Sequence, residues 1–317
     1  MTDAASTDAA STDAPATDAP ATDAPPADFL VDESLAARLV AQQHPDLAGP
    51  VRLVANGWDN ALFRLGDDLA VRMPRREAAV GLMRNEQRWL PELAAHLPVS
   101  VPAPVRDGHP APELGYDVPW SIVPWFDGRN GLAFDARARG GAAKDLAAFV
   151  AALGGMVAPA DAPSNVYRGV PLTNRAEGIR TRLAGGRIPD ADRLLAVWER
   201  ALAASAWTGP AVWLHGDLHP ANLVFTPTGS LAAVIDFGDL TAGDPATDLA
   251  TAWLTFDAAG RRDFRAELDR RQDVDAATWD RARGWALVIA SAVVEQAGTE
   301  SAFGRAGAHV LQQVLLD

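Results

Sequence analysis

The chain has 317 residues, no cysteine and a formal net charge of −13 at pH 7. The lack of cysteine excludes disulfides and thiolate metal sites and is typical of a cytoplasmic protein, and no apolar run reaches the roughly 18 residues of a membrane span. Residues 1–33 hold eight acidic residues and no basic one, so they contribute −8 of the −13, and the charge does not by itself indicate a cationic partner.

Residues 1–28 form a tail of low complexity. The triplet Thr-Asp-Ala recurs every five residues from Thr2 to Thr22, and only Ala, Ser, Thr, Asp and Pro occur between Met1 and Phe29. Such a composition cannot bury a core, so we expect this tail to be disordered. It also lacks the basic start and apolar stretch of a signal peptide, which favours a solubilising extension or a start codon assigned too far upstream.

After the tail, the N-terminal part of the chain alternates between β-prone runs and turn residues. Strands are predicted at 51–55, 61–65 and 69–73, with turns at 56–60 and 66–68 between them. A helical pattern covers 77–97, and an apolar run at 120–126 passes into the polar stretch 127–131.

Beyond residue 131 the pattern is mainly helical. The predicted helices cover 142–153, 190–205 with Asp190 as the N-cap, 248–256, 278–296 and 301–316.

Between the second and third of these helices stands the most distinctive motif of the chain, His215-Gly-Asp-Leu-His-Pro-Ala-Asn222, with Asp236 fourteen residues later. Turn residues at 227–230 predict a hairpin, which brings Asn222 and Asp236 side by side. The β-prone runs around the motif cover 211–214, 222–225 and 231–235.

These residue types suit phosphoryl transfer from a nucleoside triphosphate. The reaction needs hard oxygen ligands that hold Mg²⁺ against the phosphates, and Asn222 and Asp236 are such ligands. A third group must orient the acceptor hydroxyl and take its proton, and in protein kinases it is an Asp five residues before the metal-binding Asn. Asp217 stands at this position. The motif therefore predicts Asp217 as the catalytic base and Asn222 and Asp236 as the metal ligands.

The segment 213–250 resembles the aminoglycoside phosphotransferase family, which is related to choline kinases and more distantly to protein kinases. The shared features are the His-Gly-Asp-x-x-x-x-Asn loop, the metal-binding Asp and the segment Gly-Asp-Pro-x-x-Asp-Leu-Ala at 243–250. The resemblance implies that Asp248 braces the catalytic loop and that His215 supports it. Asp248 also fits an ordinary first-turn helix carboxylate, and both interpretations can hold together.

The resemblance also implies a fold and a set of cofactors. The expected fold is α+β and bilobal, like that of protein kinases: a small antiparallel sheet with one main helix at 29–126, and a larger, mainly helical lobe at 127–317. The hinge between the lobes is expected near Ser121 to Gly128, where backbone groups can bind a nucleotide base. Mg²⁺ is the expected cofactor, with ATP or GTP as the co-substrate.

On the nucleotide side the chain departs from the kinase pattern. Kinases place a Lys on the third strand to pair the phosphates with a helix Glu, but the only Lys here is Lys144. Arg72 takes this place on the third predicted strand, and Glu86 is its expected partner on the following helix. A surface salt bridge or a solvated side chain is the alternative for both. The turn that contains Gly57 and Asn60 is expected to cover the phosphates.

The sequence narrows the function without fixing the acceptor. By resemblance, the acceptor is a hydroxyl of an antibiotic such as an aminoglycoside or a macrolide, and a choline- or sugar-like metabolite is the second possibility. The spacing His215-x-Asp217-x-His219 also suits a metal-dependent hydrolase, and the missing Lys suits a catalytically silent nucleotide-binding protein. We expect no nucleic-acid or membrane partner, and the oligomeric state stays open.

Overall fold

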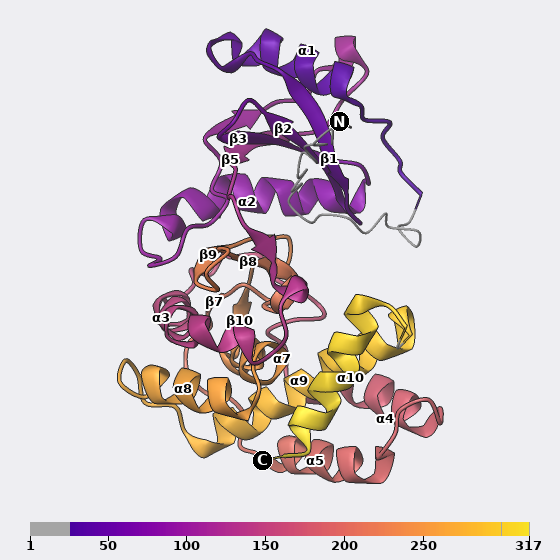
Figure 1. The fold of residues 1–317 in the computed structure, drawn as a ribbon, viewed down its shortest axis with the longest axis vertical. Coiled ribbons are helices and arrows are strands. Elements are labelled where there is room, and N and C mark those ends of the chain that lie inside the picture. The colour runs from indigo at the N-terminus through magenta and orange to yellow at the C-terminus, as the bar shows by residue number, and fades with distance from the viewer. Residues whose placement is uncertain (1–25, 299, 317) are drawn as a thin grey trace, which may run out of the picture.

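The computed structural model describes residues 26–298 and 300–316, which form two lobes stacked along the long axis of the molecule (Figure 1). The predicted tail 1–28 lies mostly outside the described residues. The chain passes from the upper lobe to the lower one after β5 (Trp120–Pro124). The upper lobe holds an antiparallel sheet and the lower one is mainly helical, as predicted for an α+β fold of the protein-kinase type.

The sheet of the N-terminal lobe has five antiparallel strands in the order β1-β2-β3-β5-β4. Phe63 pairs with Val71, and Val71 pairs with Ile122, so the three side chains share one buried face. The three predicted strands are present, whereas β4 carries two charged residues and shows no apolar pattern. The remaining strands are β1 (Val51–Asn56), β2 (Asn60–Leu65), β3 (Leu69–Pro74) and β4 (Arg106–Gly108).

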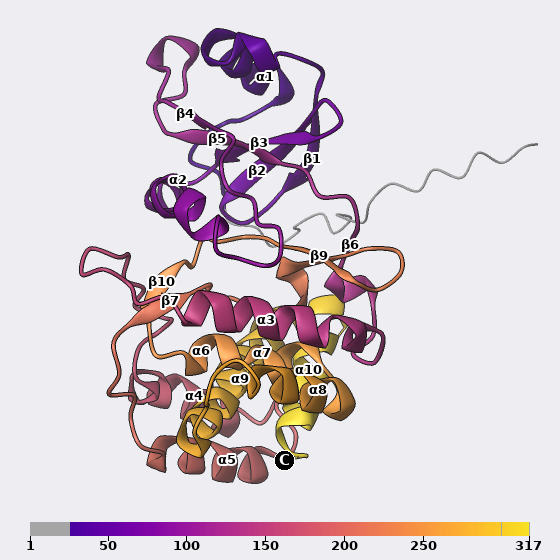
Figure 2. The same ribbon diagram turned by 90° about the vertical axis from the view of Figure 1, so that its left-hand side faces the viewer.

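Helix α1 (Glu33–Gln43) covers one face of this sheet (Figure 2). It begins after Asp32, whose carboxylate accepts a hydrogen bond from the Leu35 amide at 2.7 Å. Leu35, Leu39 and Val40 recur at helical spacing and pack in one core with the sheet. The pattern is short and adjoins the polar tail, and it was not among the predicted elements.

Helix α2 (Ala78–Ala94) lies on the opposite face and reaches the second lobe (Figure 2). The sequence predicts this helix over 77–97. Met83 accepts a hydrogen bond from the Ser121 hydroxyl of β5, whereas Leu90 and Leu93 belong to the core of the C-terminal lobe. Burial of large aliphatic side chains in that core fixes the angle between the sheet and the helical lobe.

The C-terminal lobe is built around α9 (Ala276–Ala297), whose side chains are buried along most of its length. The other helices are α3 (Ala143–Gly154), α4 (Ala176–Ala184), α5 (Ala191–Ala203), α6 (Ala246–Leu249), α7 (Thr251–Thr255), α8 (Ala258–Leu268) and α10 (Ala302–Val314). Short 3-10 turns lie at Pro45–Leu47, Pro112–Leu114, Gly131–Ala133, Ala138–Ala142, Leu172–Arg175 and Pro220–Asn222.

Two helix predictions need correction. Asp190 stands at the N-cap position of α5, as predicted, but its side chain caps no amide: its backbone is left-handed with φ of 56°, and its carboxylate pairs with Arg193. The single helix predicted over 248–256 is divided in two at Ala250, between α6 and α7. Helices α4 and α8 were not predicted, because their polar composition weakens the apolar pattern.

Five short strands in the C-terminal lobe hold the predicted motif. Strand β7 (Val212–Leu214) pairs with β10 (Thr241–Gly243), and β6 (Arg129–Asn130) adds to β8 (Leu223–Phe225) and β9 (Leu231–Val234). The hairpin predicted between the second and third runs is confirmed, since Leu223 pairs with Val234. The Ile235 amide donates to the Asn222 carbonyl at 2.9 Å, so Asn222 and Asp236 lie at the same end of the hairpin.

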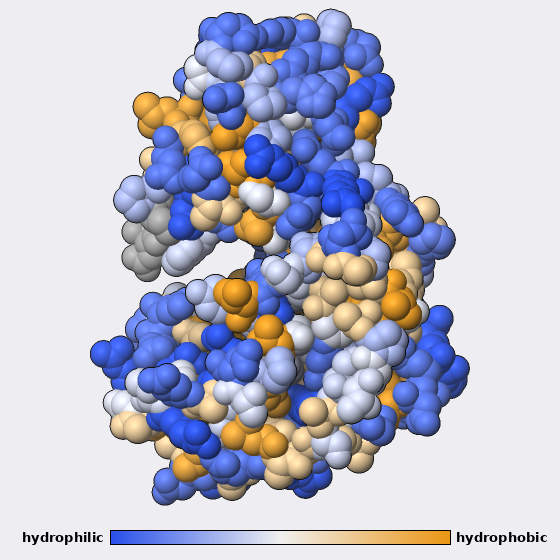
Figure 3. Space-filling model, turned by 180° about the vertical axis from the view of Figure 1, so that it is seen from behind, coloured by the Kyte–Doolittle hydropathy of each residue, from blue (hydrophilic) through white to orange (hydrophobic). Residues whose placement is uncertain are grey.

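The surface is hollowed between the two lobes (Figure 3). Among residues 26–298 and 300–316, no helix is both long enough and apolar enough to span a bilayer.

Candidate active site

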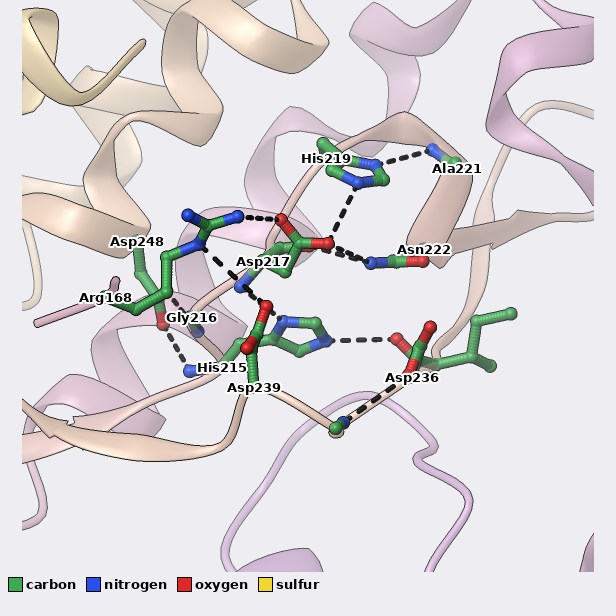
Figure 4. Close-up of polar contacts among 12 residues, drawn as sticks. Arg168, His215, Gly216, Asp217, His219, Ala221, Asn222, Asp236, Asp239 and Asp248 are labelled. Atoms are coloured by element: carbon green, nitrogen blue, oxygen red, sulfur yellow. Dashed lines mark hydrogen bonds and ion pairs between the residues drawn. The ribbon is translucent and has the colours of Figure 1, made fainter. Parts of the chain in front are cut away.

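The loop between β7 and the 3-10 turn at Pro220–Asn222 is held by Asp248 of α6 (Figure 4). The buried carboxylate of Asp248 accepts hydrogen bonds from the His215 amide at 2.7 Å and the Gly216 amide at 2.9 Å. Burial raises the pKa of Asp248, while His215 and these two amides act against that rise. Asp248 therefore occupies the bracing position that the resemblance implies.

His215 and Gly216 fix the shape of the same loop. The Nδ1 atom of His215 accepts from the Asp217 amide at 3.2 Å, so Nε2 carries the proton and donates to the Ile235 carbonyl at 3.0 Å. Gly216 has φ of 86°, and a Cβ there would lie 2.3 Å from the Asp239 carbonyl oxygen. Only glycine fits this position, and His215 ties the loop to the chain just before Asp236.

Asp217 is oriented by three side chains (Figure 4). Its Oδ1 atom lies 3.0 Å from Nη2 of Arg168, and its Oδ2 atom lies 3.1 Å from Nε2 of His219. The Asn222 amide nitrogen donates to Oδ2 at 3.3 Å and to the Asp217 carbonyl at 2.8 Å. Burial alone would raise the pKa of Asp217, but the charges and hydrogen bonds of His219 and Arg168 outweigh it and hold the pKa well below its usual range. Asp217 is thus ionised and fixed in place.

His219 contacts Asp217 directly, a role that the sequence did not predict. Its Nδ1 atom accepts from the Ala221 amide at 3.2 Å, and its ring lies against Phe303 of α10 with centroids 5.4 Å apart. Burial lowers the pKa of His219, but the Asp217 carboxylate outweighs this effect and raises it. The Nε2 atom of His219 carries the proton that is donated to Asp217.

Asn222 and Asp236 offer oxygen atoms on the same side of the hairpin. Both hydrogen bonds of the Asn222 side chain use its nitrogen, which leaves Oδ1 as the atom that can face a cation. Asp236 adopts a left-handed backbone with φ of 64°, which costs about 1–2 kcal/mol in a residue with a side chain. Such strain is common where a side chain must point in one direction. An amide oxygen and a carboxylate fit the hard-oxygen preference of Mg²⁺.

Arg72 connects the N-terminal lobe to this group. Its Nη1 atom pairs with Glu86 of α2, and its Nη2 atom lies 3.2 Å from Oδ1 of Asp236. Burial lowers the pKa of Arg72, but the charges of Glu86 and Asp236 outweigh this effect and raise it. The expected pairing of Arg72 with Glu86 is present in the structure, and the guanidinium stays charged although it is buried.

The turn between β1 and β2 reaches the same charged group through Asp59. Burial raises the pKa of Asp59, Arg76 opposes the rise, and the nearby carboxylate of Asp236 adds to it. Gly57 donates its amide to the Asn60 carbonyl at 2.9 Å and so closes the turn. The two predicted residues thus shape the turn, and Asp59 supplies its charge.

Arg168 was not singled out from the sequence, although it contacts the predicted base directly. It comes from the segment between α3 and α4, and its Nε atom lies 4.0 Å from Oδ2 of Asp239. The Asn165 amide holds Asp239 from the other side, with Nδ2 at 2.6 Å from Oδ1. No local pattern marks Arg168, because 49 residues separate it from Asp217.

An apolar pocket adjoins the catalytic loop on the far side of His219. Phe303 and Val293 come from α10 and α9, and Leu132 closes the opposite wall. The remaining lining residues are Pro220, Leu254, Ile289, Ala290, Ala306, Gly307 and Val310. The pocket lies next to the residues that orient Asp217, and it was not predicted because its walls come from distant helices.

The same architecture occurs in solved structures of antibiotic-modifying kinases. The GDP complex of aminoglycoside 2'-phosphotransferase-IIIa aligns with a TM-score of 0.66 at 18% identity, covering 90% of this chain and 99% of that one. The macrolide 2'-phosphotransferase from Brachybacterium faecium aligns with a TM-score of 0.60 at 25% identity, covering 88% and 98%. A ternary complex of an aminoglycoside phosphotransferase with streptomycin and ATP has a TM-score of 0.57 at 17% identity, covering 84% and 90%.

The sequence itself matches a family model. A search of curated protein sequences returned no match. The model described as the phosphotransferase enzyme family matches residues 50–285, which include β1, the hairpin and the first part of α9. The match spans well over half of the chain and contains Asp217, Asn222 and Asp236. The chain therefore belongs to the phosphotransferase enzyme family.

Proposed function

We propose that this protein is a kinase that transfers the γ-phosphoryl group of ATP or GTP to a hydroxyl group of an antibiotic. The observation that carries the proposal is the orientation of Asp217, which is ionised and held beside two oxygen ligands suited to Mg²⁺. Family membership supports phosphoryl transfer, and the nucleotides bound by structural neighbours, GDP and ATP, support a nucleoside triphosphate as the donor.

Each residue has one role in the proposed reaction. The acceptor hydroxyl hydrogen-bonds to Asp217, its oxygen attacks the γ-phosphorus, the bond to the β-phosphate oxygen breaks, and the hydroxyl proton passes to Asp217. Mg²⁺, when bound, neutralises phosphate charge, and Oδ1 of Asn222 and the Asp236 carboxylate are the groups that hold it. Arg72, kept in place by Glu86, steadies the phosphates. The turn with Gly57 and Asn60 covers them.

The surroundings of Asp217 favour a macrolide over an aminoglycoside. The pocket beside His219 is small and apolar apart from the imidazole itself, so it has room for a small apolar group of an acceptor and offers no carboxylate to an ammonium group. Arg168 lies on the other side of Asp217, and Arg175 is close to it: burial and the charge of Arg168 lower the pKa of Arg175. These guanidinium groups offset the carboxylates of Asp217 and Asp239, which reduces the attraction for a polycationic acceptor. The macrolide 2'-phosphotransferase at 25% identity supports the same choice.

The other possibilities have less support. In a metal-dependent hydrolase, His215 and His219 would bind the metal, but both ring nitrogens of His215 are engaged by the backbone, and both nitrogens of His219 by Asp217 and Ala221. A catalytically silent nucleotide-binding protein would not need the Asp217 carboxylate to be held in one orientation. A hydroxylated metabolite remains the second acceptor class.

The proposal is tested by a coupled assay with Mg-ATP and Mg-GTP against panels of macrolides, aminoglycosides and hydroxylated metabolites. We expect phosphorylation of a macrolide hydroxyl, and decreased macrolide susceptibility of a sensitive host that expresses the protein. Transfer to aminoglycosides alone would contradict the acceptor class, and transfer to metabolites alone would establish the second class. Nucleotide binding without turnover across all panels would contradict the kinase itself.

A further inference from the structure

We propose that Arg168 contacts the transferred phosphoryl group during the reaction and stabilises its charge, an inference that rests on the proposed kinase function. Arg168 contacts Asp217 at 3.0 Å, so its guanidinium lies where the acceptor hydroxyl and the phosphoryl group must meet (Figure 4). In phosphoryl transfer, negative charge is spread over the three equatorial oxygens, and an arginine is well suited to neutralise it.

The contact with Asp217 does not give Arg168 a role in proton transfer. Arg168 holds one carboxylate oxygen of Asp217 at 3.0 Å, and a guanidinium has no proton to give up near neutral pH. A loose transition state has little need of a strong base, but it does need positive charge near the transferring group. The charge of Arg168 therefore has its role when a phosphoryl group is present.

Arg168 also has donor capacity to spare. A guanidinium has five N–H donors, and Nη2 is engaged by Asp217. The Nε atom is buried without a hydrogen-bond partner, and the nearest carboxylate oxygen, on Asp239, is 4.0 Å away. A buried donor without a partner is costly, so its retention indicates a group that is satisfied by substrate.

The backbone next to Arg168 is fixed to the same support as the catalytic loop. The Gly169 amide donates to the Thr247 hydroxyl of α6 at 3.2 Å, and its carbonyl accepts from the Asp244 amide at 3.3 Å. Gly169 has φ of 68°, and a Cβ there would meet the Ala242 carbonyl at 3.0 Å. Helix α6 thus positions Arg168 through Thr247 and Asp217 through Asp248, which is the preorganisation that transition-state stabilisation requires.

The chain has no lysine that can take this part. Lys144 is exposed on α3 and is the only Lys of the protein. Arg72 is held on the nucleotide side by Glu86 and Asp236, which leaves Arg168 on the acceptor side. Arg168 moves no proton in this scheme and remains a guanidinium throughout, and the bonds made and broken are those of the proposed transfer.

The test compares R168A, R168K and R168Q with the control R180A, which removes an exposed arginine paired with Glu199 on the surface. Measured quantities are nucleotide hydrolysis without acceptor, transfer to an accepted antibiotic, the affinity for Mg-ADP alone and with aluminium fluoride, and thermal unfolding. We expect R168A to lower kcat by about 10²- to 10³-fold with little change in nucleotide KM. R168K should retain more activity than R168Q, and R180A should be unchanged.

Two readouts separate transition-state stabilisation from a structural role. Added guanidinium should restore part of the activity of R168A, and R168A should lose affinity for the aluminium fluoride complex while keeping its affinity for Mg-ADP. Wild-type kcat in R168A, or a loss that guanidinium does not rescue with unchanged aluminium fluoride affinity, would overturn this inference alone. A wild-type protein without nucleotide turnover would instead contradict the proposed function.

Discussion

Asp217 is the residue on which the proposed chemistry depends, and its partners come from three parts of the chain. Arg168 comes from the segment before α4. His219 lies two residues after Asp217 in the same loop, and Asn222 lies at the start of the hairpin. Together they keep the carboxylate ionised and fix both of its oxygens. A base held in this way does not have to reorient when the acceptor binds.

The substitution Asp217→Asn keeps the shape of the side chain and removes the carboxylate. Loss of a general base typically costs about 10²- to 10⁴-fold in rate, so we expect kcat to fall by that factor while Mg-nucleotide affinity is retained. Rapid-quench or coupled kinetics and nucleotide-binding titration measure the two effects. Asp161→Asn, which alters an exposed ion pair with Arg88, is the matched control. Near-wild-type turnover in D217N would rule out its role as base.

Arg72 binds in two directions, and a lysine cannot reproduce this geometry. Its two terminal nitrogens contact Glu86 and Asp236, whereas an ammonium is a single point charge. Loss of one charged hydrogen bond is worth about 1.5–3 kcal/mol, so Arg72→Lys should raise nucleotide KM or lower kcat by about tenfold or more. Arg106→Lys in an exposed pair with Asp46 serves as the control. Unchanged kinetics in R72K would place the phosphate grip elsewhere.

At the level of elements, α2 does more than carry Glu86. Its first half packs against the sheet and its second half enters the core of the C-terminal lobe, where Trp89 also lies against Trp213 with centroids 5.1 Å apart. The helix therefore transmits the position of the sheet, and with it that of Arg72, to the catalytic loop. The lobe arrangement and the nucleotide grip depend on the same element.

Leu90→Ala tests this connection. Leu90 is fully buried in the C-terminal core, and truncation of such a leucine costs about 2–5 kcal/mol in the free energy of unfolding. Leu195→Ala on α5, where the side chain is 36% exposed, should change stability by less than about 0.5 kcal/mol. Denaturant unfolding of both variants gives the comparison. Equal free energies of unfolding for L90A and L195A would contradict the role of α2 in joining the two lobes.

At the level of the whole molecule, the predicted tail 1–28 overlaps with the folded protein, because Asp28 hydrogen-bonds to the N-terminal lobe. The Asp28 amide donates to the Arg75 carbonyl at 2.8 Å, and its carboxylate accepts from the Glu77 amide at 2.9 Å, just before α2. These bonds join Asp28 to the N-terminal lobe. Residues 26–28 thus have a structural part that their composition does not suggest.

Two truncations distinguish these residues from the rest of the tail. Deletion of residues 1–25 should leave kcat and the unfolding temperature unchanged. Deletion of residues 1–28 should keep kcat but lower stability by about 1 kcal/mol, because two hydrogen bonds to the lobe are lost. Steady-state kinetics and thermal unfolding of both proteins test this expectation. A large loss of turnover in the shorter deletion would show that the tail takes part in catalysis.

The sequence predicted what depends on local pattern and on short-range spacing. The strands around Arg72 and the hairpin between Asn222 and Asp236 follow from alternating apolar residues and turn chemistry, which neighbouring residues impose on the backbone. The spacing of Asp217 and Asn222 reflects one loop, so it is readable along the chain. Asp190 occupies the predicted N-cap position but makes no capping hydrogen bond, because that bond depends on the backbone angle of one residue, which composition does not reveal.

The amino-acid sequence by itself determined the reaction class, the two-lobed fold, and the pairing of Arg72 with Glu86. Only the tertiary structure decided which groups surround Asp217: Arg168 lies 49 residues away, and the apolar pocket combines residues from α7, α9 and α10. The physical reason is that hydrogen bonding and apolar burial act locally in strands and helices, whereas a cleft forms where distant elements pack. Long-range packing is therefore what decides the choice of acceptor.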